Sequence, residues 1–217
     1  MSTTARSKKE IELHEQKLAA EIKKIETETK LTAYEVQEYQ RQERNAKAKN
    51  SEARVYNFVD QVSTNSVKSA IGTLTEWVRR NKTPITIVFN SPGGNVFAGL
   101  ALYDAIKVIE QEGIEVTTVA RGMAASMAGI LLQAGNKRVI GENAYILIHE
   151  VSDLAVGTTT EIEDELKLTK RLQKRLVNIL AERATIPASK IEKEWKRKDW
   201  WLDAAEAVEL GFADAIG

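Results

Sequence analysis

Apolar segments of strand length alternate with amphipathic segments from about residue 54 onward, and this alternation limits the fold more than any other feature. The strand-like runs are residues 55–59, 85–89, 114–119, 139–140 and 144–148. Apolar residues recur at helical spacing over residues 64–78, 97–110 and 161–183. Strands that alternate with helices are typical of an α/β domain with a largely parallel sheet.

The first 52 residues have a different character. Twenty of the first fifty are acidic or basic, and none is Gly or Pro. Ile11, Leu18, Ile22 and Ile25 form an apolar stripe that is too narrow for a core helix. We predict a charged arm over residues 1–52, either helical or a disordered tail, and one folded domain over residues 53–217.

Charge and composition exclude several functions. The 31 basic residues balance 31 acidic ones, which gives no electrostatic case for nucleic acid or an anionic membrane. Cysteine is absent and the histidines are only His14 and His149, so neither a metal site nor another cofactor is expected. No apolar run approaches 18 residues, so we expect no membrane span and a cytoplasmic location.

A lone serine lies where an apolar strand gives way to a helical segment. Residues 122–128 (GMAASMA) place Ser126 among small residues just before the run 129–134. The first N–H groups of a helix lack internal partners and can hold an oxyanion beside such a hydroxyl. The alternative is that Ser126 merely caps the helix.

Two further segments supply candidate groups at strand ends. Residues 90–94 (NSPGG) follow the strand at 85–89, and ligands of open α/β sheets bind at the carboxyl ends of strands. Adjacent glycines let the backbone approach a ligand closely, although the same residues also suit a plain turn. His149 ends the run 144–148 and is the candidate base, unless it only hydrogen-bonds a neighbour.

These segments, taken together, resemble the ClpP family of caseinolytic serine peptidases. The motifs at 90–94, 122–127 and 147–149 occur in the family's order, as do 199–202 (DWWL) and 205–211 (AEAVELG). The resemblance covers residues 54–217, about three quarters of the chain. It implies a crotonase-like ββα superhelix with a protruding handle helix, for which the segment from Glu161 is the match.

The resemblance also implies the catalytic groups. Ser126 would be the nucleophile, His149 the general base and Asp199 the carboxylate that orients the imidazole. The backbone N–H groups of Gly94 and Met127 would form the oxyanion hole.

Asp203 is the alternative to Asp199 as the orienting carboxylate. It stands three residues before Glu206, which is the spacing of a capping box ahead of the helical run 204–210. A structural role therefore accounts for Asp203, and Asp199 falls on the family's catalytic position.

Assembly and partners follow from the same resemblance. The family forms heptameric rings that stack face to face around a chamber for polypeptide substrates, and it works with an unfoldase ATPase. A strand-like segment at 154–160 resembles the part that pairs with an extended substrate. Residues 1–50 do not match the family's amino-terminal loops, so coupling to an ATPase stays open.

Several functions remain as hypotheses. The leading one is a serine endopeptidase that acts inside an oligomeric chamber, with a bacteriophage capsid-maturation protease, located in the host cytoplasm, as a variant. The second is a catalytically weak structural or regulatory ring subunit. It gains support from Glu150, which replaces the family's usual Gln beside His149 and could weaken it as a base. An acyl-CoA enzyme ranks last, because such enzymes have no need of a Ser-His pair.

Overall fold

A computed structural model describes residues 53–152, 155–196 and 198–217, together with ten positions between residues 18 and 41. The chain divides into two compact units, Met1–Asn50 and Ser51–Gly217. The ten described positions of the first unit are helical, and Leu18, Val36 and Tyr39 among them are exposed. The rest of the predicted arm lies outside the described residues, so the domain division at residues 52 and 53 stays a prediction.

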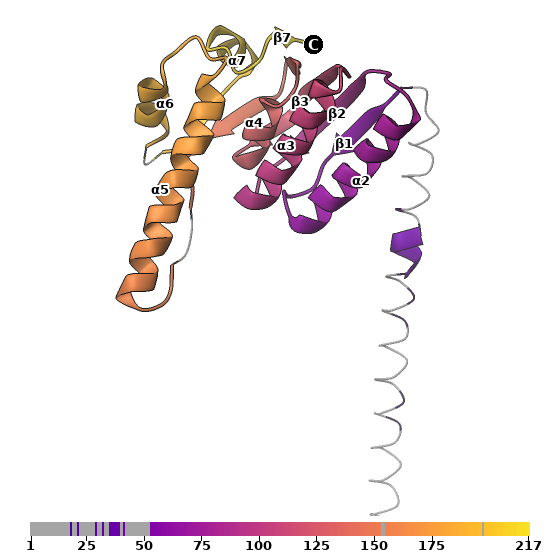
Figure 1. Ribbon diagram of the computed structural model, residues 1–217, viewed down its shortest axis with the longest axis horizontal. Coiled ribbons are helices and arrows are strands. Elements are labelled where there is room, and N and C mark those ends of the chain that lie inside the picture. The colour runs from indigo at the N-terminus through magenta and orange to yellow at the C-terminus, as the bar shows by residue number, and fades with distance from the viewer. Residues whose placement is uncertain are drawn as a thin grey trace, which may run out of the picture. The chain divides into compact units, whose positions relative to one another are not determined.

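One mixed sheet organises the second unit (Figure 1). Its strands are β1 (Val55–Phe58), β2 (Ile85–Ser91), β3 (Val116–Ala125), β4 (Lys137–Ile140), β5 (Tyr145–Ile148), β6 (Trp200–Leu202) and β7 (Ala215–Ile216). The order is β1-β2-β3-β4-β7, while β5 pairs with β3 and with β6. Every pairing is parallel except that of β5 with β6. The predicted α/β class is confirmed.

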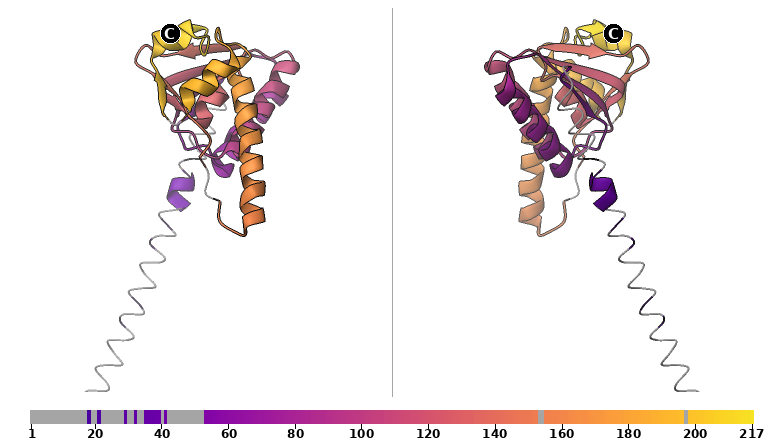
Figure 2. Two further views of the ribbon diagram at one scale, coloured as in Figure 1. Left: turned by 90° about the vertical axis from the view of Figure 1, so that its left-hand side faces the viewer. Right: turned by 90° about the vertical axis from the view of Figure 1, so that its right-hand side faces the viewer.

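Helices follow most of the strands. They are α2 (Thr64–Arg80), α3 (Val96–Gln111), α4 (Met127–Leu132), α5 (Thr159–Ala181), α6 (Ala188–Trp195) and α7 (Ala204–Glu209). α2 and α3 pack side by side (Figures 1 and 2). Ser63 caps the start of α2 through a capping box with Ser66.

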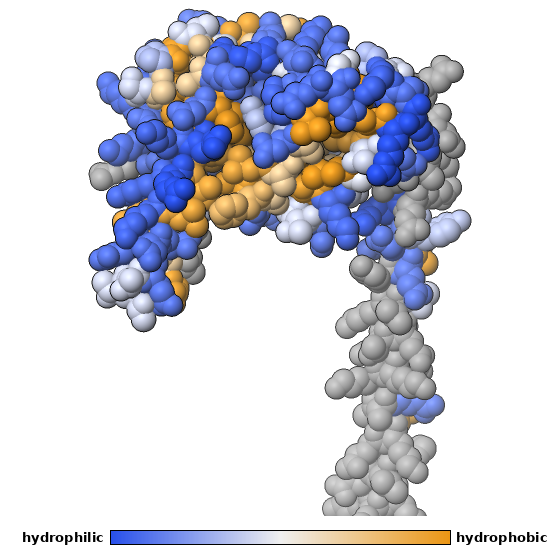
Figure 3. Space-filling view, in the orientation of Figure 1, coloured by the Kyte–Doolittle hydropathy of each residue, from blue (hydrophilic) through white to orange (hydrophobic). Residues whose placement is uncertain are grey.

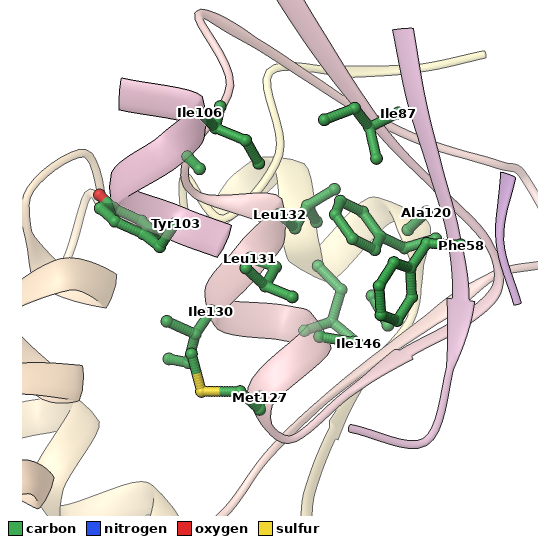
Figure 4. Close-up of a cluster of buried hydrophobic side chains, with 14 of the residues drawn as sticks. Phe58, Ile87, Tyr103, Ile106, Ala120, Met127, Ile130, Leu131, Leu132 and Ile146 are labelled. Atoms are coloured by element: carbon green, nitrogen blue, oxygen red, sulfur yellow. The ribbon is translucent and has the colours of Figure 1, made fainter. Parts of the chain in front are cut away.

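The core lies between these helices and the sheet. Leu131 and Leu132 of α4 are fully buried with Phe89, Ala120 and Ile146 of the strands. Figure 4 shows α4 passing through this apolar cluster, with Met127 at its beginning. Because α4 is buried along its whole length, its first residue is held in a fixed position relative to three strands.

β3 is longer than the sequence pattern predicts. We expected the strand to end near Val119, but it continues to Ala125. Its first half pairs with β4, and its last residues, Met123–Ala125, pair with β5. The prediction failed because residues 121–123 are exposed and carry no local strand pattern, so pairing with a distant segment decides their conformation.

The handle helix α5 protrudes from the body of the unit, as predicted (Figure 2). Its buried residues, Leu176, Val177, Ile179 and Leu180, all lie near its carboxyl end, while Ile162 and Leu166 nearer its amino end are exposed.

The segment before α5 is not a strand over residues 155–160. Thr159 and Thr160 begin the helix, and Thr158 caps it. The Thr158 N–H donates to the Glu161 carboxylate at 2.7 Å, and the Thr158 hydroxyl accepts from the Glu161 N–H at 3.4 Å. This reciprocal cap favours a helix start over an extended segment, so the predicted strand is wrong over residues 158–160. Residues 155–157 are irregular, and pairing of this segment with a substrate stays a prediction. Leu154 lies outside the described residues.

Candidate active site

Ser126 occupies a strained turn between β3 and α4. Its φ is 54° and its ψ is −122°, and no other non-glycine residue in the described part of the chain has a positive φ. The Ser126 N–H donates to the Leu147 carbonyl at 2.8 Å, and the Ser126 carbonyl accepts from the Gly129 N–H at 3.0 Å. Such a conformation costs about 1–3 kcal/mol and persists only where neighbouring contacts enforce it.

The Ser126 side chain does not cap α4. Although Ser126 stands at the cap position, its hydroxyl makes no capping hydrogen bond. The interpretation of Ser126 as a simple helix cap is therefore wrong. Ser126 is instead one of the residues that line a cavity.

The glycines of the NSPGG segment let its backbone lie directly against Ser126. A Cβ placed on Gly93 would stand 2.5 Å from the Ala125 carbonyl oxygen and 2.7 Å from Ser126 Cβ. Gly93 also has a φ of 87°, a conformation that disfavours other residues. The Val62 N–H holds the loop by donating to the Gly93 carbonyl at 2.8 Å.

Two backbone donors are available beside the Ser126 hydroxyl. Gly94 and Met127 line the same cavity as Ser126. In the described part of the chain, neither residue's N–H donates a hydrogen bond. Unpaired N–H groups beside a nucleophile are the arrangement that an oxyanion hole requires.

Close packing fixes the Met127 backbone. Its side chain is buried against α3, where a Cβ on Gly99 would lie 2.3 Å from Met127 Cγ. Only a residue without a side chain leaves room for this contact, which holds the start of α4 against α3.

His149 follows β5 and lines two cavities. One contains Ser126, and the other contains Asp199 and Lys198. β5 and β6 are antiparallel, and Ile148 pairs with Trp200. The residues just beyond that pair, His149 and Asp199, therefore lie across from each other at the end of the ladder.

The predicted triad residues come together without hydrogen bonds among them. Over residues 53–152, 155–196 and 198–217, no hydrogen bond joins Ser126 Oγ to His149, or His149 to Asp199. Catalytic hydrogen bonds are often long in unliganded enzymes and tighten when substrate binds.

Asp203 has the structural role that its spacing predicts. Its carboxylate accepts the Glu206 N–H at 2.9 Å, and the Glu206 carboxylate accepts the Asp203 N–H at 3.0 Å. This capping box occupies Asp203 at the start of α7, whereas Asp199 lies in the cavity beside His149.

Some residues of the site have no clear signal in the sequence. Leu176 and Leu180 of α5 and Trp195 of α6 line the Ser126 cavity. Gln173 of α5 donates to the Glu150 carboxylate at 3.2 Å. The spacing of Ile191 and Trp195 could have identified the buried face of α6, but nothing local connects that face to Ser126.

Among the residues that the structure describes, no group of three or more His, Cys, Asp or Glu residues could hold a metal ion. Within the same residues, no helix is long and apolar enough to cross a membrane.

A family model described as Clp protease matches residues 61–217. This chain belongs to the Clp protease family. A curated relative from Tropheryma whipplei, ATP-dependent Clp protease proteolytic subunit 2, is 39% identical over 137 residues, which cover 62% of this chain and 74% of the relative. The ATP-dependent Clp protease proteolytic subunit of Porphyromonas gingivalis is 37% identical over 134 residues. That match covers 61% of this chain but only 59% of the relative's length.

Proposed function

We propose that this chain is a serine peptidase in which Ser126, His149 and Asp199 form the catalytic triad. One observation carries the proposal. Ser126 stands in a strained turn with its hydroxyl free of any cap, in a cavity that also contains His149 and two unpaired N–H groups. Family membership supports the same activity, since the curated relatives are named as proteolytic subunits.

The reaction divides into acylation and deacylation. His149 takes the proton from Ser126 Oγ as the oxygen attacks the peptide carbonyl, and then gives that proton to the departing amine. This leaves an acyl-enzyme ester on Ser126. Water, activated by His149, then attacks the ester, which releases the acid and restores the hydroxyl. Asp199 holds the imidazole orientation and stabilises its cationic form.

The N–H groups of Gly94 and Met127 would stabilise the oxyanion in both steps. Both belong to backbone that packing holds in place, so they need little rearrangement when negative charge develops on the carbonyl oxygen. Loss of one such donor costs about 3 kcal/mol of transition-state stabilisation in comparable hydrolases.

Assembly into a ring is part of the proposal. The exposed apolar residues Ile162, Leu166 and Leu168 on the protruding part of α5 support contact with another subunit. In the proposed form, homo-oligomeric rings of seven subunits, stacked in pairs, enclose the active sites in the cytoplasm and admit polypeptide substrates. An unfoldase ATPase is the proposed partner for substrate delivery.

A catalytically weak ring subunit is the second candidate. The observation that favours it is the lack of hydrogen bonds among Ser126, His149 and Asp199 in the described residues. The two candidates differ in whether the assembled protein activates Ser126. A capsid-maturation protease of a bacteriophage would share the chemistry of the first candidate and differ only in its substrate.

Labelling with a fluorophosphonate probe tests the proposal. Intact mass is measured for the full chain and for Ser126→Ala, after light scattering has established the oligomeric mass. We expect one adduct per subunit in the wild type and none in Ser126→Ala. The matched control is Ser152→Ala, since Ser152 lines the same cavity and that variant should keep the adduct. An assembled wild type that remains unlabelled would favour the weak ring subunit.

A further inference from the structure

Ser91 carries a buried hydroxyl that the proposed mechanism does not use. It is the last residue of β2 and is 0% exposed, in the same NSPGG segment that supplies the proposed oxyanion donor Gly94. The register between β2 and β3 shifts between Phe89 and Ser91, so that Ser91 pairs with Ala124, two residues before Ser126. Irregularities of this kind redirect side chains beside active sites. Ser91 therefore lies next to the part of β3 that leads into Ser126.

The Ser91 hydroxyl joins two backbone segments. Its Oγ donates to the Asp60 carbonyl at 2.7 Å and accepts from the Gly93 N–H at 3.2 Å. Two backbone hydrogen bonds join the same segments. The Val62 N–H donates to the Gly93 carbonyl, and the Asn95 N–H donates to the Val62 carbonyl, both at 2.8 Å. Ser91 supplies the one side chain in this set of contacts, so a substitution can remove its part alone.

These contacts orient the peptide unit between Gly93 and Gly94. In the described part of the chain no peptide bond is cis, and the C=O and N–H of a trans peptide point in opposite directions. Because the Gly93 carbonyl accepts from the Val62 N–H, the Gly94 N–H of the same unit points away from Val62. Gly94 lines the cavity that contains Ser126. The orientation of the proposed oxyanion donor therefore depends on how the Gly93 backbone is held.

Consecutive glycines make this orientation dependent on hydrogen bonds. Gly93 has a φ of 87° and Gly94 a φ of 146°, and residues without a side chain have more accessible backbone conformations than any others. Ser91 Oγ holds Gly93 at its N–H, and Val62 holds it at its carbonyl. Gly93 is buried, and a buried N–H without a partner is costly. Loss of the Ser91 hydroxyl should therefore move the loop.

We propose that Ser91 is a positioning residue for the oxyanion hole, which holds Gly93 so that the Gly94 N–H meets the carbonyl under attack. This inference rests on the proposed peptidase function. The effect should appear in the transition state and not in substrate binding, because negative charge on the carbonyl oxygen develops only as Ser126 attacks. A hydroxyl that merely stabilised the fold would change the unfolding free energy and leave kcat of the folded enzyme unaltered.

The test compares kcat and KM of the full-length wild type and Ser91→Ala for a fluorogenic peptide with leucine before the scissile bond. Leucine suits the cavity, because Ile130, Leu176 and Leu180 line it and Figure 3 shows apolar surface gathered beside α5. We expect kcat of Ser91→Ala to fall about 10- to 100-fold, because removal of a whole donor costs about 100-fold or more, while KM changes by less than about twofold.

Thr118→Val is the matched control. Thr118 is 0% exposed, as Ser91 is, and its Oγ1 donates to the Leu132 carbonyl at 2.6 Å. It belongs to β3 and is not among the residues that line the Ser126 cavity. Loss of this hydroxyl should destabilise the fold as Ser91→Ala does, yet keep kcat within about twofold of the wild type. Equal losses of kcat in the two variants would overturn the proposal, because they would indicate a general effect of stability.

A second variant, Ser91→Cys, keeps the test decisive if Ser91→Ala folds poorly. Cysteine is close to serine in size, but its thiol is a weak donor and a weak acceptor, so kcat should fall about threefold or more with KM unchanged. The inhibition constant of a peptide aldehyde should rise by the same factor, because its tetrahedral adduct with Ser126 places an oxygen in the oxyanion hole. A kcat that neither substitution alters, or a change confined to KM, would overturn the proposal.

The rate of fluorophosphonate labelling separates this inference from the proposed function. Labelling of Ser126 that slows in the Ser91 variants by the factor seen in kcat supports the inference, since the phosphoryl oxygen of the adduct also needs the oxyanion hole. Labelling at the wild-type rate in these variants would overturn the inference alone. An assembled wild type that is neither labelled nor active would overturn both.

Discussion

At the scale of single residues, the site depends on backbone positions that tolerate little change. Ser126 adopts a positive φ, and Gly93 passes so close to it that a Cβ would contact Ser126 Cβ at 2.7 Å. The folded structure tolerates the strain because hydrogen bonds to Leu147 and Gly129 hold both sides of Ser126. In this strained turn Ser126 lines the cavity, and its side chain does not cap α4.

We predict that Gly93→Ala impairs both stability and reactivity. The new methyl group would push the loop from Ser126, and a positive φ disfavours alanine, so the variant should lose about 2 kcal/mol or more of unfolding free energy. Displacement of Gly94 should slow fluorophosphonate labelling about 100-fold. Urea unfolding and the labelling rate measure the two effects.

The control for this prediction is Gly72→Ala. Gly72 lies inside α2 with open space where a Cβ would be placed. Alanine favours a helix interior, so this variant should gain about 0.5–1 kcal/mol of unfolding free energy and keep its labelling rate. Similar losses in both variants would contradict the interpretation of Gly93.

At the scale of elements, strand β6 and helix α7 place two nearby aspartates in different surroundings. The antiparallel pairing of β5 with β6 places Asp199 across from His149. Asp203, on the other side of β6, closes the capping box of α7. We therefore propose that Asp199 acts in catalysis, whereas Asp203 stabilises the start of a helix.

Substitution of the two aspartates should separate these roles. Asp199→Asn should lower turnover about 10⁴-fold with little change in Tm, as for the orienting carboxylate of other triads. Asp203→Ala should lower the unfolding free energy by about 1 kcal/mol through loss of the cap and retain labelling of Ser126. Thermal unfolding and peptidase assays on both variants give the comparison. If Asp203→Ala alone abolished turnover, the assignment would be reversed.

At the scale of the whole folded unit, the buried Arg138 binds the segment that leads into the last strand, β7. Arg138 of β4 is 2% exposed and contacts Asp214 through its guanidinium at 2.6 Å and through its backbone N–H at 2.7 Å. Arg183, which follows α5, pairs with the same carboxylate at 2.8 Å. Asp214 thus joins β4, β7 and the segment after α5.

These contacts change the acidity of Asp214. Burial would by itself raise the pKa of Asp214, but the hydrogen bonds and charge of Arg138, together with the charge of Arg183, lower it below the ordinary value. Because the folded pKa is depressed, the stabilisation is complete above the unfolded pKa of about 3.9 and is lost as the pH falls through the folded value.

We therefore predict that acid removes a stabilisation that depends on Asp214. The wild type should exceed Asp214→Asn in unfolding free energy at about pH 6, and the difference should shrink by about pH 3. Urea unfolding at the two pH values measures it. Asp164→Asn is the control, because Asp164 and its partner Lys167 are exposed and such pairs contribute little. A difference for Asp214→Asn that stayed constant with pH would refute the prediction.

The sequence alone determined the class of fold, most helix positions and the candidate nucleophile. Some sequence features act through residues close by in the chain, so their effects can be inferred from the sequence. These features are amphipathic spacing, capping residues such as Asp203, and the small residues around Ser126. The order of motifs along the chain also indicated the family that the match over residues 61–217 established.

Only the tertiary structure decided how these parts meet. Three features join segments that lie far apart in the sequence. They are the extension of β3 to Ala125, the pairing that sets His149 across from Asp199, and the contact of Gln173 with Glu150. Residues 158–160 likewise form a helix cap and the start of α5 where the sequence indicated a strand. Local propensity is weak compared with long-range pairing and burial, and those depend on which distant segments the folded chain brings together.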